Sequence, residues 1–185
     1  MSMNIKRKYK IIYADPPWSY QDGGVPRDGV NKQYQTMNLQ DIKNLSVSDI
    51  ADDISVLLLW STFPQLENAL EVIRAWGFKY KTLGFNWVKT NKDGSIFLGI
   101  GHYSRSNAEV CLLGVRGNAI SLVKSHSVSN VVMHPKAKHS EKPPIVRDKI
   151  VQLFGDLPRI ELFARQKIKG WDAWGDEVES DIQLT

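Results

Sequence analysis

The stretch Ile11-Ile12-Tyr13-Ala14-Asp15-Pro16-Pro17-Trp18 decides how this chain folds. Its first half is a short apolar run, which predicts a buried strand. Asp15 and Pro16 each precede a proline, and a residue in that position is driven out of the helical region. The strand therefore has to continue into a stiff, extended tip rather than into a helix.

The side chains at this tip suggest a binding site for a flat molecule. A carboxylate and a backbone carbonyl held in a stiff segment are acceptors that need not reorganise during a reaction. Trp18 offers a flat face for stacking. Two acceptors beside such a face suit a nucleobase with an exocyclic amine. The alternative is a strand that ends in a Pro-rich turn, with Trp18 as a core anchor.

Strand and helix patterns alternate along the rest of the chain, which predicts an α/β sheet domain. Strands are expected at residues 10–14, 55–60, 81–89, 109–115, 130–133 and 160–164. Helices are expected at 39–45, from Pro64 to Gly77, and from Pro143 to Gly155. An open sheet of this kind binds ligands beyond the carboxyl ends of its strands. Asp15 and Arg165 follow the first and last of these strands.

Two segments, 19–36 and 90–108, lack periodicity and are expected to be irregular. Loops of that length are often lids or binding segments. A charge of +4 and a pI near 9.1 permit a polyanionic partner without demonstrating one. The basic residues gather at 6–8, 79–92 and 134–142, where a solvated face is the alternative explanation.

The composition is that of an ordinary soluble domain. The chain has 185 residues, 42% of them hydrophobic, which suffices for one core. We expect a single domain over 1–185, with no membrane span and no signal peptide. The single cysteine, Cys111, lies in an apolar run and predicts a small core residue. Its isolation excludes an internal disulfide and favours a reducing, cytoplasmic location.

The tip motif Asp15-Pro16-Pro17-Trp18 resembles the catalytic motif of the MT-A70 family of S-adenosylmethionine-dependent adenine N6-methyltransferases. Further blocks resemble the family in the same order. They lie at 34–37, 57–60, 87–91, 101–102, 109–117, 139–143, 161–165 and 174–177. The ordered set is specific and covers a core of about residues 9–178. It implies a Rossmann-like methyltransferase sheet flanked by helices.

The resemblance also implies roles for individual residues on the substrate side. The catalytic residues would be Asp15, Pro16, Pro17 and Trp18, with Asp15 and the Pro16 carbonyl accepting hydrogen bonds from the adenine amino group. Trp18 and Tyr34 would form the substrate pocket, and Glu109 would lie between the two ligands.

On the cofactor side, the resemblance implies S-adenosylmethionine bound by Asp15, Lys142, Glu161, Phe163, Arg165, Asp176 and Glu177. Lys142 would hold the carboxylate of the methionine part, for which a flexible cation is a sensible partner. No metal is expected, because the sulfonium already provides the leaving group. His134 and His139 lack the further ligands that a metal site requires.

Several assignments keep an alternative. Lys142 could be a surface lysine, and Glu161 with Arg165 could form a salt bridge at a strand end. Asp176-Glu177 stands where larger eukaryotic members have an Asn-Gln pair. Paired carboxylates suit ribose hydroxyls, but a solvated C-terminal turn is the other interpretation. Members with an upstream segment use residues there to contact the cofactor's adenine, whereas Asp15 lies almost at the N-terminus of this sequence. The residues that recognise the cofactor's adenine therefore stay open.

Among substrates, DNA is favoured over RNA, because the short chain resembles bacterial or phage members of the family. A duplex target would have to be flipped out to reach Asp15. The segments 19–36 and 90–108 would hold the strand. RNA methylation, a non-catalytic nucleic-acid-binding subunit and a small-molecule amine methyltransferase stay open, as does a homodimer or a partner subunit.

Overall fold

The computed structural model describes residues 7–19, 21–22, 25–26, 36–101, 103–136 and 141–184 of the chain. Seven strands form one sheet in the order β7-β5-β6-β4-β1-β8-β9. Their bounds are β1 Tyr9–Ala14, β4 Ala51–Ser61, β5 Lys79–Thr90, β6 Ala108–Arg116, β7 Val131–Pro135, β8 Arg159–Leu162 and β9 Asp172–Trp174. A separate antiparallel pair joins β2 Gln21–Asp22 to β3 Val25–Pro26.

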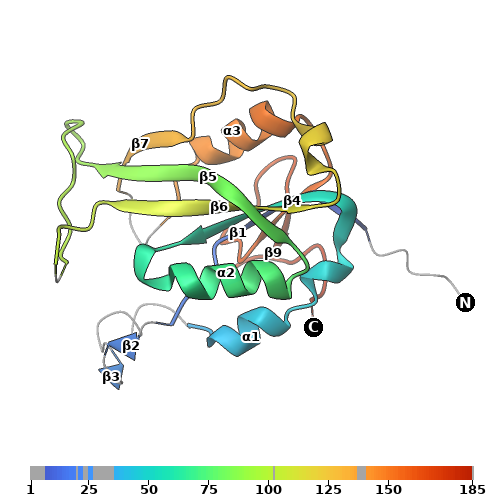
Figure 1. Cartoon of the computed structure of the whole chain (residues 1–185), viewed down its shortest axis with the longest axis horizontal. Coiled ribbons are helices and arrows are strands. Elements are labelled where there is room, and N and C mark those ends of the chain that lie inside the picture. Colours follow the sequence, from blue (N-terminus) through green and yellow to red (C-terminus); the bar gives the residue numbers. More distant parts are fainter. Residues whose placement is uncertain are drawn as a thin grey trace, which may run out of the picture.

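Helices cover both faces of the sheet, with α1 and α2 on one face and α3 on the other (Figure 1). Their bounds are α1 Leu39–Asn44, α2 Leu66–Ala75 and α3 Ile145–Phe154. Three short 3₁₀ turns are η1 Val47–Asp49, η2 Phe63–Gln65 and η3 Ala119–Leu122. The expected α/β sheet flanked by helices is thus confirmed.

The direction of β6 determines which residues meet at the functional edge. β1 pairs in parallel with β4 and β8, whereas β6 pairs antiparallel with both β4 and β5. The start of β6 therefore lies at the edge where β1, β4 and β5 end. Asp15 after β1, Lys89 near the end of β5 and Glu109 near the start of β6 consequently share one edge.

β1 is buried on both faces, which explains its continuous apolar run. Ile12 and Ala14 join the hydrophobic cluster covered by α1 and α2. Ile11 and Tyr13 point the other way, into the cluster covered by α3. Asp15 therefore emerges from a strand that is fixed by packing on each side.

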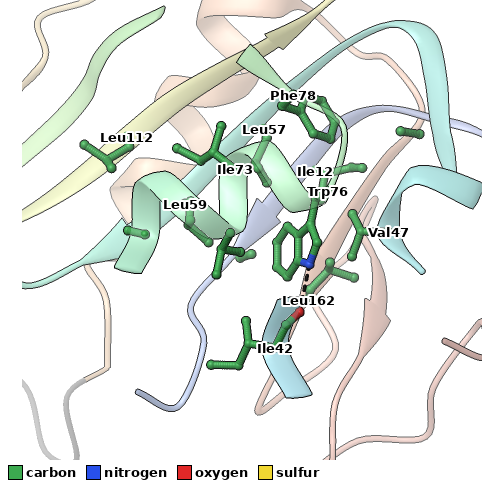
Figure 2. Close-up of a cluster of buried hydrophobic side chains, with 14 of the residues drawn as sticks. Ile12, Ile42, Val47, Leu57, Leu59, Ile73, Trp76, Phe78, Leu112 and Leu162 are labelled. Atoms are coloured by element: carbon green, nitrogen blue, oxygen red, sulfur yellow. Dashed lines mark hydrogen bonds between the residues drawn. The ribbon is translucent and has the colours of Figure 1, made fainter. Parts of the chain in front are cut away.

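Trp76 connects the two helices on the first face. Its indole is fully buried among strand residues and its Nε1 donates to the Ile42 carbonyl of α1 at 2.8 Å (Figure 2). Ala69 and Ile73 of α2 are buried beside it, as their helical spacing predicts. Gly77 then leaves the helix with a φ of 81°.

The sequence placed most elements correctly but missed some boundaries. Pro64 lies in η2, and α2 begins only at Leu66. The last expected strand was 160–164, but β8 ends at Leu162 because Phe163 turns to a φ of 60°. The three-residue strand β9 was not predicted, since it is too short to show alternation. Cys111 is fully buried, as expected.

The tryptophans expected in the core, Trp60, Trp76 and Trp87, are indeed buried. Within the segment expected to be irregular at 19–36, the described residues form the short pair β2 and β3. Among the described residues, none of the helices has the length and apolar character needed to cross a membrane.

Candidate active site

The tip after β1 is held by backbone hydrogen bonds. The Trp18 amide donates to the Pro16 carbonyl, and the Met37 amide donates to the Pro17 carbonyl, both at 2.9 Å. The Trp18 indole Nε1 donates to the Trp60 carbonyl at 3.1 Å. These contacts fix the tip against the ends of neighbouring elements, so that the Asp15 carboxylate is presented by a stiff support.

A cavity of about 440 Å³ opens beside Asp15. It lies beyond the carboxyl ends of β1 and β8, and its size is that of a typical small-molecule site. It is lined by Tyr13, Asp15, Glu141, Lys142, Arg147, Glu161, Phe163, Arg165, Gln166 and Glu177. Four of these are carboxylates and three are cations, so the cavity suits a ligand that carries charges of both signs.

Four charged side chains form a continuous chain at this edge. Lys142 Nζ lies 2.9 Å from Asp15 Oδ2 and 3.2 Å from Glu109 Oε2. The other oxygen of Glu109 accepts from Lys89 Nζ at 2.5 Å. The side chains of Lys142 and Glu109 are only 10% and 8% exposed. Lys142 Nζ also lies 5.7 Å from the centre of the Trp60 ring, a cation–π distance.

Burial and ion pairing shift the pKa values of Asp15, Glu109 and Lys142 in different directions. Burial raises the pKa of Asp15 above its usual value, although Lys142 opposes the shift. Burial also disfavours ionisation of Glu109, but Lys142 and Lys89 together lower its pKa below the usual value. Burial disfavours the charged form of Lys142, but Asp15 and Glu109 raise its pKa above the usual value. Lys142 is therefore a firmly charged ammonium, whereas Asp15 is the carboxylate that takes up a proton more readily.

Arg147 and Glu161 form a second, separate ion pair at the cavity. Arg147 Nε donates to Glu161 Oε2 and its Nη2 donates to Oε1, both at 2.7 Å. Each residue is 8% exposed. The guanidinium carbon lies 5.8 Å from the centre of the Tyr13 ring, whose hydroxyl accepts from Trp60 Nε1 at 2.6 Å. This bidentate fork joins the first turn of α3 to the end of β8.

The cavity rim is built where β8 and β9 end. The Phe163 ring packs edge-on against Trp174, with ring centres 5.3 Å apart. The Ala164 amide donates to the Trp174 carbonyl at 2.9 Å. Arg165 Nε lies 3.7 Å from Glu177 Oε1, and both side chains are substantially exposed. The rim is therefore more open to solvent than the chain of charges around Lys142.

The structure gathers most of the residues proposed for the cofactor around one cavity. They are Asp15, Lys142, Glu161, Phe163, Arg165 and Glu177. The alternative interpretation of Lys142 as a surface lysine is wrong, because its side chain is buried between two carboxylates. Glu161 finds its partner in Arg147 on α3 rather than in the arginine that follows its own strand.

Other expected residues lie elsewhere. Trp18 is 7% exposed and packs in the cluster beneath α1 and α2, the position that the core-anchor interpretation expects. Glu109 reaches the cavity-lining residues through Lys142, and Asp176 is exposed outside the cavity lining. Tyr34 and His139 lie outside the described residues.

Four residues that line the cavity were not predicted as site residues: Tyr13, Glu141, Arg147 and Gln166. Arg147 is the one of them that pairs with a predicted site residue, Glu161. The helix after Pro143 is predicted from its apolar positions alone, and that pattern does not identify the charged residue on the same face. Arg147 is three residues before Ile150 and seven before Phe154, both buried. An arginine at that spacing lies on the inward face of the helix. That spacing is a signal for a buried ion pair, but it does not identify Glu161 as the partner.

The seven-stranded sheet with helices on both faces, and a ligand-sized cavity beyond its carboxyl edge, is the architecture of an α/β methyltransferase. Comparison with known proteins agrees, since residues 9–177 match the model of the MT-A70 family. The chain therefore belongs to the MT-A70 family.

Individual relatives match over most of this chain. The Type II methyltransferase M.MunI of Mycoplasma sp is 34% identical over 190 residues, covering 94% of this chain and 79% of that protein. Human METTL3, an N(6)-adenosine-methyltransferase catalytic subunit, is 28% identical over 167 residues. An MT-A70-like N(6)-adenosine-methyltransferase of Drosophila melanogaster has the same identity over the same length. The chain covers 27% of the human protein and 26% of the Drosophila one, so it corresponds to one part of them.

Proposed function

We propose that this protein transfers a methyl group from S-adenosylmethionine to the N6 amino group of adenine in DNA. The observation that carries the proposal is the pairing of Asp15 with Lys142 at 2.9 Å on the wall of one cavity. The carboxylate proposed to bind the adenine amine, Asp15, thus lies beside the cation proposed to bind the cofactor, Lys142. We take residues 9–178 as one methyltransferase domain.

The cavity-lining side chains fit S-adenosylmethionine by their chemistry. Its methionine part carries a carboxylate, for which Lys142 is a buried cation. Its ammonium and ribose hydroxyls need acceptors, which Asp15, Glu161 and Glu177 provide. The Phe163 ring at the rim offers an apolar face to a flat base. When bound, the cofactor supplies an electrophilic methyl group on a sulfonium.

The work of this chain is to prepare the adenine amine. The N6 lone pair is delocalised into the purine ring, so the nitrogen is a poor nucleophile until it becomes pyramidal. Hydrogen bonds from its two N–H groups to Asp15 and to the Pro16 carbonyl favour that change, because both acceptors are fixed in advance. The Pro16 oxygen accepts one backbone hydrogen bond and keeps a second lone pair.

Asp15 is also suited to receive the proton that the amine loses after methylation. Its raised pKa makes it a better base than an exposed aspartate while Lys142 still favours the ionised form. Glu109 and Lys89 hold Lys142 in place from the other side. Catalysis in this scheme consists of alignment, fixed acceptors and one proton transfer.

Two observations support a nucleic-acid substrate. The segment between β5 and β6, residues 91–107, connects strands at the edge that carries Asp15; we call it the β5–β6 arm. Its exposed apolar side chains are Ile96, Leu98, Ile100 and Tyr103. It also carries Lys92 and Arg105, which can meet phosphates. A base in a duplex would have to be flipped out to reach Asp15.

DNA is the substrate that we propose because the chain aligns with 79% of the Type II methyltransferase M.MunI, in keeping with its resemblance to the short bacterial or phage members of the family. The relatives named for N(6)-adenosine methylation make RNA the second candidate. The chain aligns with only about a quarter of those proteins. METTL3 is named as a catalytic subunit, so a partner subunit belongs to the same second candidate.

The test is methyl transfer from labelled S-adenosylmethionine to adenine-containing DNA and RNA oligonucleotides and to free adenine. We expect N6-methyladenine in DNA, and we expect Asp15→Ala to lose this activity by a factor of at least about 100 while it still folds. Asp53→Ala, which changes an exposed aspartate at the start of β4, should retain full activity.

Each contrary result selects another function. Methylation of RNA in preference to DNA would support the second candidate, and methylation of free adenine would indicate a small-molecule enzyme. No detectable affinity for S-adenosylmethionine would favour a non-catalytic nucleic-acid-binding subunit. Full activity in Asp15→Ala would remove this carboxylate from the chemistry.

A further inference from the structure

We propose that Arg147 is a positioning residue for the cofactor, which holds the Glu161 carboxylate in the orientation that accepts hydrogen bonds from the ribose hydroxyls. This inference rests on the proposed function, since it assumes that S-adenosylmethionine occupies the cavity. It adds a residue from α3 to a site that was otherwise expected from the strand ends.

The geometry shows a carboxylate that is oriented before any ligand binds. Both Arg147–Glu161 hydrogen bonds measure 2.7 Å, and both partners are more than nine-tenths buried. A planar guanidinium meets a planar carboxylate in one arrangement, so the fork fixes the plane of Glu161 as well as its place. A lysine in the same position would supply charge without that fork.

The fork leaves Glu161 with capacity for a ligand. Each carboxylate oxygen has two lone pairs, and Arg147 uses one on each. Each Glu161 oxygen thus keeps one lone pair that can accept a hydrogen bond, and Glu161 lines the cavity. Two adjacent acceptors in one plane match two adjacent hydroxyl donors, which is the arrangement that a ribose presents. The fork thus turns a flexible side chain into a fixed two-point acceptor.

Arg147 is itself held by a contact with the Tyr13 ring of the sheet. Its guanidinium carbon lies 5.8 Å from the centre of the Tyr13 ring on β1. The Tyr13 hydroxyl is held by Trp60 of β4 at 2.6 Å. Residues of β1, β4 and β8 therefore surround Arg147 of α3 and hold its guanidinium in place. If the arginine is lost, the Glu161 carboxylate loses the fork that fixes its plane.

The test measures binding of S-adenosylhomocysteine by calorimetry to the wild type and to Arg147→Met, Arg147→Lys and the double variant Arg147→Met/Glu161→Gln. We expect Arg147→Met to weaken binding by roughly 10- to 100-fold, the scale seen when a partner that orients a ligand-binding side chain is removed. Arg147→Lys should recover only part of this loss. The double variant contains no unpaired buried carboxylate, so it should fold even if Arg147→Met does not, and it should also bind weakly.

The 2′-deoxy form of S-adenosylhomocysteine separates positioning from general destabilisation. In the wild type, loss of this hydroxyl should weaken binding, whereas in Arg147→Met it should make little further difference. Steady-state kinetics should show a raised KM for S-adenosylmethionine, with kcat at saturation within about twofold of the wild type. A variant that is merely unstable would not lose its discrimination between the two ligands.

Arg159→Met is the matched control. Arg159 begins β8, pairs with Asp156 at 2.5 Å and lies 5.4 Å from the Trp171 ring, so it resembles Arg147 chemically. It lies at the other end of β8, and its variant should bind as the wild type does. If the wild type binds no S-adenosylhomocysteine, the proposed function fails. If the wild type binds and Arg147→Met or the double variant binds equally well, only the role of Arg147 is overturned.

Discussion

Lys142 is shared between two carboxylates whose pKa values shift in opposite directions. Its ammonium lies 2.9 Å from Asp15 and 3.2 Å from Glu109. Because Lys89 also neutralises Glu109, the four groups carry balanced charge and can be buried together. Within this set, Asp15 has a raised pKa and Glu109 a lowered one. Neighbouring carboxylates with opposite shifts are typical of sites in which one group exchanges a proton and the other stays ionised.

The raised pKa of Asp15 predicts how stability depends on pH. The folded protein holds the Asp15 proton more tightly than the unfolded chain does, so this contribution is fully present below the ordinary pKa of 3.8 and is lost as pH rises through the raised value. Asp15→Asn lacks this dependence. We expect the free energy of unfolding of the wild type to increase relative to Asp15→Asn as pH falls from about 7 towards 4.

Thermal unfolding of both proteins across this pH range measures the effect. The informative quantity is how the difference in unfolding free energy between the wild type and Asp15→Asn changes with pH, whatever that difference is at neutral pH. A difference that stays constant, or that changes in favour of Asp15→Asn at low pH, would contradict a raised pKa.

For single residues, the sequence was informative where a motif by itself restricts the backbone conformation. Asp15 could be located because two prolines force an extended tip after an apolar run. The role of Trp18 as a core anchor or a stacking surface could not be decided, because an indole beside a strand end suits both. Arg147 escaped notice because its partner Glu161 comes from a different element, and pairing between elements is set by tertiary packing.

Among the elements, the end of β8 depends on the close approach of a single glycine. A Cβ on Gly175 would lie 2.4 Å from the Ala164 carbonyl oxygen and 2.8 Å from its amide nitrogen. Both are backbone atoms that a side-chain rotation cannot move. The close approach lets the turn after β9 cross the turn after β8, next to the cavity residues Phe163 and Arg165.

We therefore predict that Gly175→Ala destabilises the fold by more than about 1 kcal/mol, which lowers Tm by roughly 2–4 °C or more in a chain of this size. Binding of S-adenosylhomocysteine should weaken as well, because the rim residues shift. Gly94→Ala is the control for ligand affinity: its φ of 85° strains an alanine, so this variant also loses stability. A Cβ there meets no atom within 4 Å and the turn lies outside the cavity, so its ligand affinity should be unchanged. Unchanged ligand affinity in Gly175→Ala would show that the rim does not depend on this crossing.

Element types could be read from the chain more reliably than their directions. The apolar run at 109–115 predicted a strand, and β6 is found at Ala108–Arg116. Nothing in its alternation indicates that it runs antiparallel between β4 and β5. The direction of a strand depends on how the loops before and after it connect it to the rest of the sheet. The placement of Glu109 beside Lys142 was therefore available from the family resemblance but not from the local pattern.

For the molecule as a whole, the β5–β6 arm is the main exposed apolar feature at the functional edge. Leu98 and Ile100 are 66% and 93% exposed, and Tyr103 is fully exposed. Such side chains contribute little to folding, but aromatic stacking on a base contributes about 1–3 kcal/mol. The arm is thus a candidate for nucleic-acid contact that stability does not explain.

We expect the triple variant Leu98→Ser/Ile100→Ser/Tyr103→Ser to keep Tm and cofactor affinity but to lose at least about fivefold in DNA affinity. Ile120→Ser is the control, because Ile120 is 69% exposed in η3, which follows β6 at the opposite edge of the sheet. Fluorescence anisotropy with a labelled oligonucleotide at fixed salt measures both. Equal loss in the control, or none in the triple variant, would exclude the arm from DNA binding.

The reversed direction of β6 determines where the β5–β6 arm lies relative to the cavity. If all seven strands ran the same way, the connection into β6 would cross to the far side, and the arm would project away from the cavity. Reversal of this one strand puts the arm and the Asp15 tip on a common border. Under the proposed function, a polymer bound by the arm would lie beside the cavity, so that one base would rotate inward while its neighbours stay outside.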